Sequence, residues 1–249
     1  MDKLKIDINC DMAEGVGNEK ELMPFISSAN IACGYHAGNE ALMKTTINLC
    51  LKYNVAIGAH PSFPDRENFG RTNMNLPLVE VSKIVTDQLY LIKKIAEAHG
   101  AKLHHVKPHG ALYNMAAKDP ALAHCIAIAI KNVDENLILY GLSQSVMISE
   151  AEKIQLKSAN EVFADRTYQL DGSLTPRTQP NALITNELEA ILQTVRLVKE
   201  NKVKTGNGEE INLKADTICL HGDGSHAVEF ARLIYSSFGK EKIKIQAFY

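Results

Sequence analysis

The chain contains 249 residues, 45% of them hydrophobic and 22% charged, with a formal net charge of -2. This composition is typical of a globular protein, and the near-zero net charge excludes the broad basic surface that binds nucleic acid. No apolar run approaches the length that spans a bilayer, so we expect neither a nucleic-acid nor a membrane partner. The five cysteines are scattered without a CxxC pair, which indicates reduced thiols. Because the chain opens on a strand pattern rather than a signal sequence, we expect a cytoplasmic protein.

Short apolar runs alternate with longer helical patterns along the chain. Strands are predicted over residues 4–10, 27–33, 55–59, 103–107, 137–140, 160–164 and 216–220. Helices are predicted over residues 39–53, 79–99, 119–131, 143–156, 181–201 and 224–238. A β-hairpin is predicted to turn at Gly206-Asn207-Gly208. Because no flexible linker interrupts this series, we expect one domain over 1–249 with an α/β fold, either a barrel or a doubly wound sheet.

Polar residues follow nearly every predicted strand at its carboxyl end. The strand ends are, in chain order, NCDMAEG, CGYHAGN, GAHPSFPD, VKPHGALYN, YGLSQS, FADRTY and LHGDGSH. A chance scatter of polar residues would not favour the same end of so many strands. In β/α barrels the active site is built from the carboxyl ends of the strands. The pattern therefore predicts a barrel with a shared functional site at this end, rather than a set of solvated loops.

Alternation along the first strand separates an apolar face from a polar face. Residues i and i+2 of a strand share a face, so Ile6 and Ile8 are predicted to pack against the helices. Asp7, Asn9 and Asp11 are then predicted to line the lumen. We expect Asp7, the deepest of the three, to pair with a lysine, whereas Asp11 lies at the mouth.

Asp11, His36 and His60 follow the first three strands, whose ends are neighbours in a parallel sheet. Neighbouring strands bring such side chains within about 5–10 Å of one another. One carboxylate and two imidazoles form a reasonable ligand set for a divalent metal with open coordination positions. The alternative is that the histidines hydrogen-bond to carboxylates or substrate without a metal.

Lys107 and His109 share a face of the fourth strand. A lysine that faces the lumen pairs with carboxylates or with an anionic ligand, so Lys107 either neutralises a bound anion or only pairs with Asp7 or Asp11. Histidine is the side chain best suited to accept and donate protons near neutral pH, so His109 is a candidate for proton transfer. Arg71 follows a proline-containing loop that suits either a lid with an anion-binding arginine or a solvated loop.

The sixth and seventh strands add further charged residues. Glu161 and Asp165 share a face, and Arg166 comes next. His221 and Asp223 follow the last strand, where a glycine-containing turn enters a helix and can receive an anion. The sequence contains no P-loop, no GxGxxG fingerprint after a strand and no GxSxG elbow, so it shows none of these nucleotide-binding or nucleophile motifs.

Together these motifs resemble the LamB/YcsF family, the proteins that form the A subunit of 5-oxoprolinase. The stretches that carry the resemblance are, in order, INCDMAEG, SANIACGYHAGN, GAHPSFPD, NFGR, HVKPHGALYN, EVFADRTY and CLHGD. They cover nearly the whole chain. The resemblance implies a TIM-like β/α barrel with about seven parallel strands, related to the glycoside hydrolase/deacetylase folds. It also implies ATP-dependent cleavage of 5-oxoproline (pyroglutamate) to glutamate, ADP and phosphate, in a complex with two other subunits.

A few positions depart from the family pattern. Cys10 and the pair Met12-Ala13 replace the small and Leu-Gly positions of the first motif, although its polar residues match. Asn39 stands where the family pattern has an aspartate, so we assign it no charge-bearing role.

The chemistry of lactam cleavage suggests roles for the candidate residues. Phosphorylation of the amide oxygen makes the ring carbon electrophilic, and such a site needs cations for the phosphate and carboxylates that position water. The candidate catalytic residues are Asp11, Lys107, His109, Glu161, His221 and Asp223. The candidate substrate-binding residues are Asn9, Glu14, Arg71, Asp165 and Arg166. ATP is the expected cofactor, and a divalent metal held by Asp11, His36 and His60 is a further candidate.

Two other functions remain open at this point. One is a metal-dependent deacetylase that acts on a carbohydrate or another amide, and the other is a non-catalytic subunit that binds the substrate for its partners. The sequence also leaves open whether ATP binds to this chain or to a partner, and whether identical chains associate.

Overall fold

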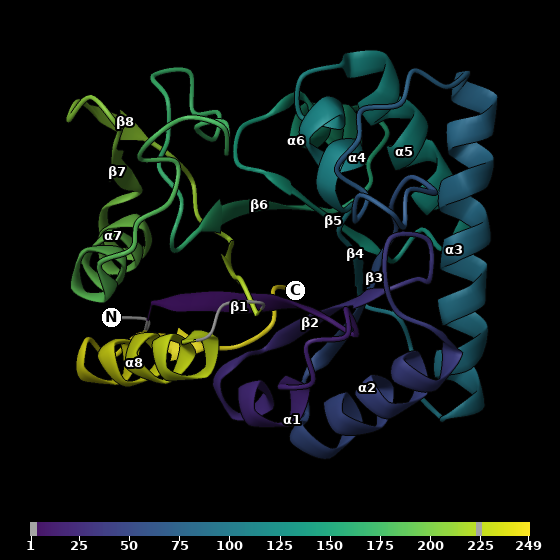
Figure 1. The fold of residues 1–249 in the computed structure, drawn as a ribbon, viewed down its shortest axis with the longest axis horizontal. Coiled ribbons are helices and arrows are strands. Elements are labelled where there is room, and N and C mark those ends of the chain that lie inside the picture. The colour runs from purple at the N-terminus through teal and green to yellow at the C-terminus, as the bar shows by residue number, and fades with distance from the viewer. Residues whose placement is uncertain (1–3, 223–225) are drawn as a thin grey trace.

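Seven parallel strands close into a barrel in the described part of the chain (Figure 1). The computed structural model describes residues 4–222 and 226–249. The barrel strands are β1 (Lys5–Met12), β2 (Ser28–Ala32), β3 (Ala56–His60), β4 (His105–Val106), β5 (Ile138–Leu142), β6 (Ser158–Phe163) and β9 (Thr217–Leu220). Each strand pairs in parallel with the next, and β9 closes the barrel by pairing with β1. The predicted TIM-like barrel of about seven strands is therefore confirmed.

Helices surround this barrel and connect its strands (Figure 1). They are α1 (Glu19–Leu22), α2 (Glu40–Tyr53), α3 (Leu78–Ala98), α4 (Gly110–Ala116), α5 (Pro120–Val133), α6 (Val146–Lys153), α7 (Glu187–Glu200) and α8 (Ala227–Lys240), with a 3₁₀ turn, η1 (Met23–Phe25), after α1. Within the described ranges, no helix is both long enough and apolar enough to cross a bilayer.

Side-chain caps fix the starts of α2, α5 and α7. The Asp119 carboxylate accepts hydrogen bonds from the backbone N–H groups of Ala121 and Leu122, which confirms the predicted start of α5. Asn39 accepts from the backbone N–H of Leu42 at the start of α2. The asparagine that departs from the family pattern therefore has a structural role as a helix cap.

The lumen of the barrel contains a buried ladder of polar side chains. Asn30 Nδ2 donates to Asn9 Oδ1 at 2.7 Å, and His105 Nε2 lies 2.8 Å from Asn30 Oδ1. All three residues are fully buried, and they come from three different strands. Ile6 and Ile8, on the other face of β1, belong to the hydrophobic core. These contacts confirm the predicted alternation of β1.

Asp7 is held by hydroxyl groups, so the prediction that it pairs with a lysine is wrong. Ser27 and Ser28 donate to its Oδ1 at 2.6 and 2.8 Å, and Thr217 donates to its Oδ2 at 2.6 Å. Burial raises the pKa of Asp7 above its usual 3.8, against the opposing effect of these hydroxyl donors. Lys107 lies one layer nearer to the mouth, where it contacts Asn9 and not Asp7.

The predicted helix over 181–201 begins six residues later, at Glu187. The segment 164–186 is instead a long loop after β6, in which Leu183 pairs with Arg166 in an isolated β-bridge. Ile184 also donates its backbone N–H to the Asp165 carbonyl at 2.8 Å. These long-range contacts override the apolar character of the residues before Asn186, which caps α7.

The other elements differ from their predictions mainly at their ends. The predicted hairpin is confirmed as β7 (Lys202–Lys204) and β8 (Glu210–Asn212), which pair antiparallel. The predicted helix over 143–156 is shorter and corresponds to α6. Four short elements, α1, η1, α4 and β10 (Lys244–Ile245), were not predicted, and β10 pairs with the start of β1. The first residues of the helix predicted over 224–238 lie outside the described residues.

Gly58 makes room for the polar ladder, which leads to a stability prediction. A Cβ at this position would lie 2.1 Å from His105 Nε2, and His105 is itself stacked on Tyr140 with ring centroids 4.1 Å apart. We expect Gly58→Ala to lower the free energy of unfolding by about 1–3 kcal/mol or more, since the ring has no space to move into. Urea denaturation followed by circular dichroism measures this change.

Gly239→Ala is the matched control, because a Cβ at Gly239, in the last turn of α8, meets nothing within 4 Å. This variant is expected to be neutral or stabilising by about 0.5–1 kcal/mol. Equal stabilities of the two variants would contradict the assigned role of Gly58.

Candidate functional site

A cavity of about 700 Å³ opens at the carboxyl ends of the barrel strands. Residues at the ends of β1, β3, β5 and β6 line it, together with residues that directly follow β4 and β9. The loop after β6 supplies one wall through residues 173–178. The predicted location of a shared site at the strand ends therefore coincides with a cavity large enough for a small molecule.

Lys107 is the central cation of this site. Its Nζ lies 2.9 Å from Asp11 Oδ1 and 2.8 Å from Glu161 Oε1. It also donates to Asn9 Oδ1 at 3.2 Å and to Cys219 Sγ at 3.1 Å. The lysine side chain is only 3% exposed and that of Glu161 is fully buried, so each charge depends on the other for compensation.

The pKa values of this group follow from its burial and its opposite charges. Burial opposes every charged form, but Asp11, Cys219 and Glu161 together hold the pKa of Lys107 well above its usual 10.5. Burial likewise opposes ionisation of Asp11, but His60 and Lys107 hold the pKa of Asp11 well below its usual 3.8. Lys107 is therefore a permanent cation, and Asp11 is a permanent anion, at neutral pH.

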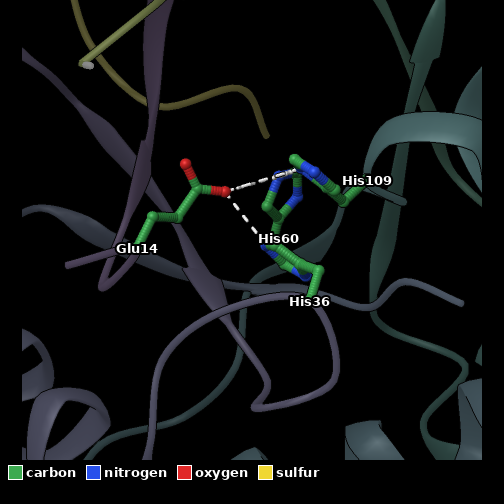
Figure 2. A group of neighbouring side chains, drawn as sticks. All are labelled: Glu14, His36, His60 and His109. Atoms are coloured by element: carbon green, nitrogen blue, oxygen red, sulfur yellow. Dashed lines mark hydrogen bonds and ion pairs between the residues drawn. The ribbon is translucent and has the colours of Figure 1, made fainter. Parts of the chain in front are cut away.

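A second group, defined as the Glu14 cluster, contains Glu14, His36, His60 and His109 (Figure 2). Each residue offers one donor atom, and these atoms lie within 4.8 Å of one another. Glu14 Oε1 is 3.0 Å from His36 Nε2 and 3.5 Å from His109 Nδ1. His60 Nε2 is 2.9 Å from His109 Nδ1. The three imidazoles and the carboxylate thus point toward one small volume beside the cavity.

Burial and the neighbouring charges give the three histidines different pKa values. Burial, together with the charge of His60, lowers the pKa of His36 to about 3 and that of His109 to about 2. Burial also opposes the charged form of His60, but Asp11 and Glu14 outweigh it and raise the pKa of His60 above its usual 6.5. His36 and His109 are therefore neutral at physiological pH.

A tight turn after β1 brings Glu14 into this cluster. Ala13 has a φ of 61° and Gly15 a φ of 91°, so the chain leaves the extended conformation directly after Met12. A Cβ at Gly38 would lie 2.8 Å from the Ala13 carbonyl oxygen, which shows how closely the neighbouring loop packs against the turn. The turn directs Glu14 toward the three histidines, while Asp11 stays in the strand and faces Lys107.

His221 lies between an acid and a guanidinium at the other side of the cavity. Its Nδ1 is 2.8 Å from the carboxylate of Asp165, and its Nε2 is 3.0 Å from Arg177 Nη2. The carboxylate only accepts, so Nδ1 carries the proton and Nε2 accepts from Arg177. Burial raises the pKa of Asp165, but His221 outweighs this effect and the pKa of Asp165 lies below 3.8.

The predicted anion-binding arginines occupy different environments. Arg71 lines the cavity, and its guanidinium carbon lies 5.1 Å from the centre of the Phe69 ring. Arg166 also lines the cavity but is buried, with its Nε and Nη2 donating to the carbonyls of Ala182 and Thr175. Arg166 therefore fastens the loop after β6, and Arg71 presents the more open cation.

The structure thus brings most of the predicted site residues together. Asn9, Asp11, Lys107 and Glu161 form one contact group, and Asp165 and His221 form another. The predicted metal set of Asp11, His36 and His60 stays a prediction, and the donor atoms that converge among the described residues include Glu14 and His109 in place of Asp11. The predicted catalytic residue Asp223 lies outside the described residues.

Two residues of the cavity wall were missed. Arg177 lies in the loop after β6, far from any strand end in sequence, so the strand-end pattern had no means of finding it. Tyr113 lies within α4, one helical turn after His109, and the motif HGALYN was the available signal. Burial, with a contribution from Glu161, raises the pKa of Tyr113 well above its usual 10.0, so its hydroxyl stays protonated.

Comparison with known proteins gives the same assignment as the motifs. A model of the LamB/YcsF family matches residues 6–249. The chain belongs to the LamB/YcsF family. A relative from Bacillus cereus (strain Q1), named as the A subunit of 5-oxoprolinase, is 51% identical over 246 residues, which cover 96% of this chain and 97% of the relative. The predicted family resemblance is therefore confirmed.

Solved structures agree with the barrel described above. The crystal structure of a lactam utilization protein from Thermus thermophilus is similar with a TM-score of 0.92 and 38% identity, covering 98% of this chain and 100% of that one. The peptidoglycan deacetylase PdaC from Bacillus subtilis gives a TM-score of 0.51 at 12% identity, covering 99% of this chain and 88% of that one. At that identity, the likeness to the deacetylase shows the fold alone.

Removal of the central cation leads to a prediction about stability and pH. Lys107→Met leaves Asp11 and Glu161 buried without their cation, which typically costs about 3–5 kcal/mol. Without the cation the pKa of Asp11 rises, so the loss of stability is largest near neutral pH and shrinks as acid protonates this carboxylate. Urea unfolding at pH 5 and pH 8 measures the difference.

Lys83→Met is the control, because Lys83 forms a helical ion pair with Asp87 and its side chain is 73% exposed. We expect little change in this variant at either pH. A Lys107→Met variant with wild-type stability at pH 8 would contradict the compensation described above.

Proposed function

We propose that this protein is the A subunit of a multi-subunit 5-oxoprolinase, which uses ATP to convert 5-oxoproline to glutamate. The observation that carries the proposal is the 51% identity, over 96% of the chain, to a relative named as the A subunit of 5-oxoprolinase. The name of the Thermus protein, a lactam utilization protein, is consistent with the same substrate class. Because the relative is named as one subunit among several, its name also supports the existence of partner subunits, of which we propose two.

The cavity has the size and charges that this substrate needs. Its volume of about 700 Å³ accommodates a five-membered ring with one carboxylate. Arg71 and Arg177 line the same cavity, and a guanidinium can bind a carboxylate through two parallel hydrogen bonds. We propose that the substrate carboxylate binds at this cationic side, with the lactam carbonyl toward Lys107.

The proposed reaction consumes one ATP and two water molecules. The γ-phosphoryl group of ATP is transferred to the lactam oxygen, which releases ADP and makes the ring carbon electrophilic. One water molecule adds to that carbon, and cleavage of the C–N bond opens the ring to an acyl phosphate. A second water molecule then releases phosphate and leaves glutamate. Lys107 is assigned to the negative charge that develops on the lactam oxygen.

His221 is assigned to proton transfer in this reaction. Its Nδ1–H is held by Asp165, so Nε2 is the atom that exchanges a proton at the cavity. Glu161 and Asp11 are assigned to positioning Lys107, because both contact its amino group. Asp11, Lys107 and His221 line the cavity, whereas Glu161 is fully buried and acts through Lys107.

The proposal predicts the behaviour of the assembled enzyme. The chain and its two partner subunits should together form glutamate from 5-oxoproline only when ATP is present. Lys107→Met should reduce kcat by at least about 100-fold, as expected when one electrostatic stabiliser of a developing oxyanion is removed. Lys83→Met should keep the wild-type rate, since Lys83 lies on the exposed face of α3. Glutamate is measured by a coupled assay and phosphate release by colorimetry.

The remaining functions give different results in the same experiments. No ATP-dependent glutamate from the complete set of subunits would refute the proposal. Acetate release from an N-acetylated sugar without ATP would support the deacetylase instead. Wild-type turnover with Lys107→Met or His221→Gln, combined with 5-oxoproline binding by calorimetry, would support a non-catalytic binding subunit. Calorimetry of the isolated chain with ATP decides which chain holds the nucleotide.

A further inference from the structure

We infer that the Glu14 cluster is a binding site for one divalent transition-metal ion. Its four residues come from four different segments: the turn after β1, the loop after β2, the end of β3 and the residue that precedes α4. Their side chains nevertheless point toward one volume (Figure 2). Three imidazoles and one carboxylate form a recognised ligand set for ions such as Zn²⁺.

The spacing of the donor atoms suits one small ion. An ion about 2.0–2.1 Å from each ligand of a tetrahedral site holds those ligands about 3.3 Å apart. Glu14 Oε1 lies 3.0, 3.5 and 3.8 Å from the nearest ring nitrogens of His36, His109 and His60. His60 Nε2 and His109 Nδ1 are 2.9 Å apart. These separations lie on both sides of the tetrahedral value, so the spacing of the donor atoms fits one ion.

The outward-facing nitrogens of two histidines are tied to backbone carbonyls. His60 Nδ1 lies 2.7 Å from the Lys107 carbonyl oxygen, and His109 Nε2 lies 2.9 Å from the Phe69 carbonyl oxygen. A carbonyl oxygen only accepts, so these two nitrogens carry protons. In the neutral rings, His60 Nε2 and His109 Nδ1 then carry lone pairs, and both lone pairs face the cluster.

His36 is oriented through a hydroxyl group. Ser62 Oγ lies 2.9 Å from His36 Nδ1 and also 2.9 Å from the Phe63 carbonyl oxygen. His36 Nε2 lies 3.0 Å from Glu14 Oε1, which only accepts, so without a metal ion Nε2 donates to Glu14. A bound metal ion would displace that proton, and a proton on Nδ1 facing Ser62 would then leave the Nε2 lone pair directed into the cluster. Gln88 on α3 fixes the position of Ser62, because its amide bonds both the backbone N–H and the carbonyl of that residue.

Once the protons between these atoms are displaced, the inward-facing nitrogens and the Glu14 carboxylate form one set of metal ligands. Neutral His60 Nε2 and His109 Nδ1 repel each other at 2.9 Å unless a proton or a metal ion lies between them. Metal-binding histidines typically donate their second N–H to a carbonyl or another acceptor, as His60 and His109 do here. Imidazole donors favour Zn²⁺ and its transition-metal neighbours over Mg²⁺ and Ca²⁺, which prefer oxygen ligands.

Binding must tilt one ring. The rings of His36 and His109 stack with centroids 3.8 Å apart and planes 6° from parallel. Because the lone pair of an imidazole nitrogen lies in the ring plane, a single ion cannot lie in both planes at once. Loading therefore rotates one of these two rings, and the adjoining cavity provides space beside His109.

A bound ion would adjoin the proposed substrate site, since Glu14, His60 and His109 all line the cavity. It would supply Lewis-acid activation of a carbonyl oxygen or of a water molecule. The inference itself stands on the donor geometry and does not depend on the proposed lactam activity. Its test therefore measures binding and not turnover.

The experiment titrates the full chain, stripped with a chelator, with Zn²⁺ by isothermal calorimetry. We expect one Zn²⁺ per chain and no comparable binding of Mg²⁺. Glu14→Gln and His60→Gln should each weaken Zn²⁺ binding by at least about 100-fold, and Ser62→Ala by about 10–100-fold, the usual effect of removing an outer partner of a ligand. His124→Gln is the control, because the His124 side chain is 48% exposed and pairs with Glu150 on the outside of the barrel.

Substitution of Co²⁺ for Zn²⁺ tests the coordination in the unaltered chain, in case a variant fails to fold. Intense visible absorption bands, typical of four-coordinate Co²⁺, would support the inference. The weak bands of six-coordinate Co²⁺ would overturn it. Absence of Zn²⁺ binding, or Zn²⁺ binding that is unchanged in folded Glu14→Gln and His60→Gln, would also overturn it and would leave a proton as the shared cation.

Discussion

The compensation of a buried lysine by two acids is the interaction on which the rest of the site depends. Lys107 stands in the lumen with its Nζ between Asp11 and Glu161, at 2.9 and 2.8 Å. Removal of three charges from water costs several kcal/mol each unless they compensate one another. The barrel therefore has to hold strands β1, β4 and β6 in a fixed relation. The residues at the carboxyl ends of these strands are therefore held in fixed positions for any reaction at the site.

The polar lumen sets a second constraint, because a barrel normally fills its interior with apolar side chains. Here, Asn9, Asn30 and His105 hydrogen-bond across the interior instead. The absence of a side chain at Gly58 leaves room for the His105 ring. Below them, Asp7 is satisfied by hydroxyl groups, so no second buried cation is needed. Each layer of the lumen is thus paired internally, and Lys107 forms the last layer before the cavity.

Alternation along the strands was sufficient to place these polar side chains in the lumen, but their hydrogen-bond partners and the turns required tertiary information. A period of two places Asp11 and Lys107 in the lumen, whatever surrounds them. Glu14 joins the histidines only because Ala13 adopts a φ of 61°, and nothing in an alanine signals a left-handed conformation. The path of the long loop after β6 could not be predicted from the strand pattern either. Its path depends on pairings such as Arg166 with Leu183, and it carries Arg177 to the cavity.

Lys107 also connects the two charged groups, which are otherwise formed by different segments. Its amino group binds Asp11 Oδ1, and its carbonyl oxygen receives the Nδ1–H of His60. The other oxygen of Asp11 lies 3.4 Å from His60 Nε2. The lysine thus holds one oxygen of Asp11 through its amino group and orients a histidine of the Glu14 cluster through its carbonyl oxygen. A cation in the cluster and a cation on Lys107 would then face the same cavity from two directions. A carbonyl oxygen bound between them would meet positive charge on both sides, which is the environment that a developing oxyanion requires.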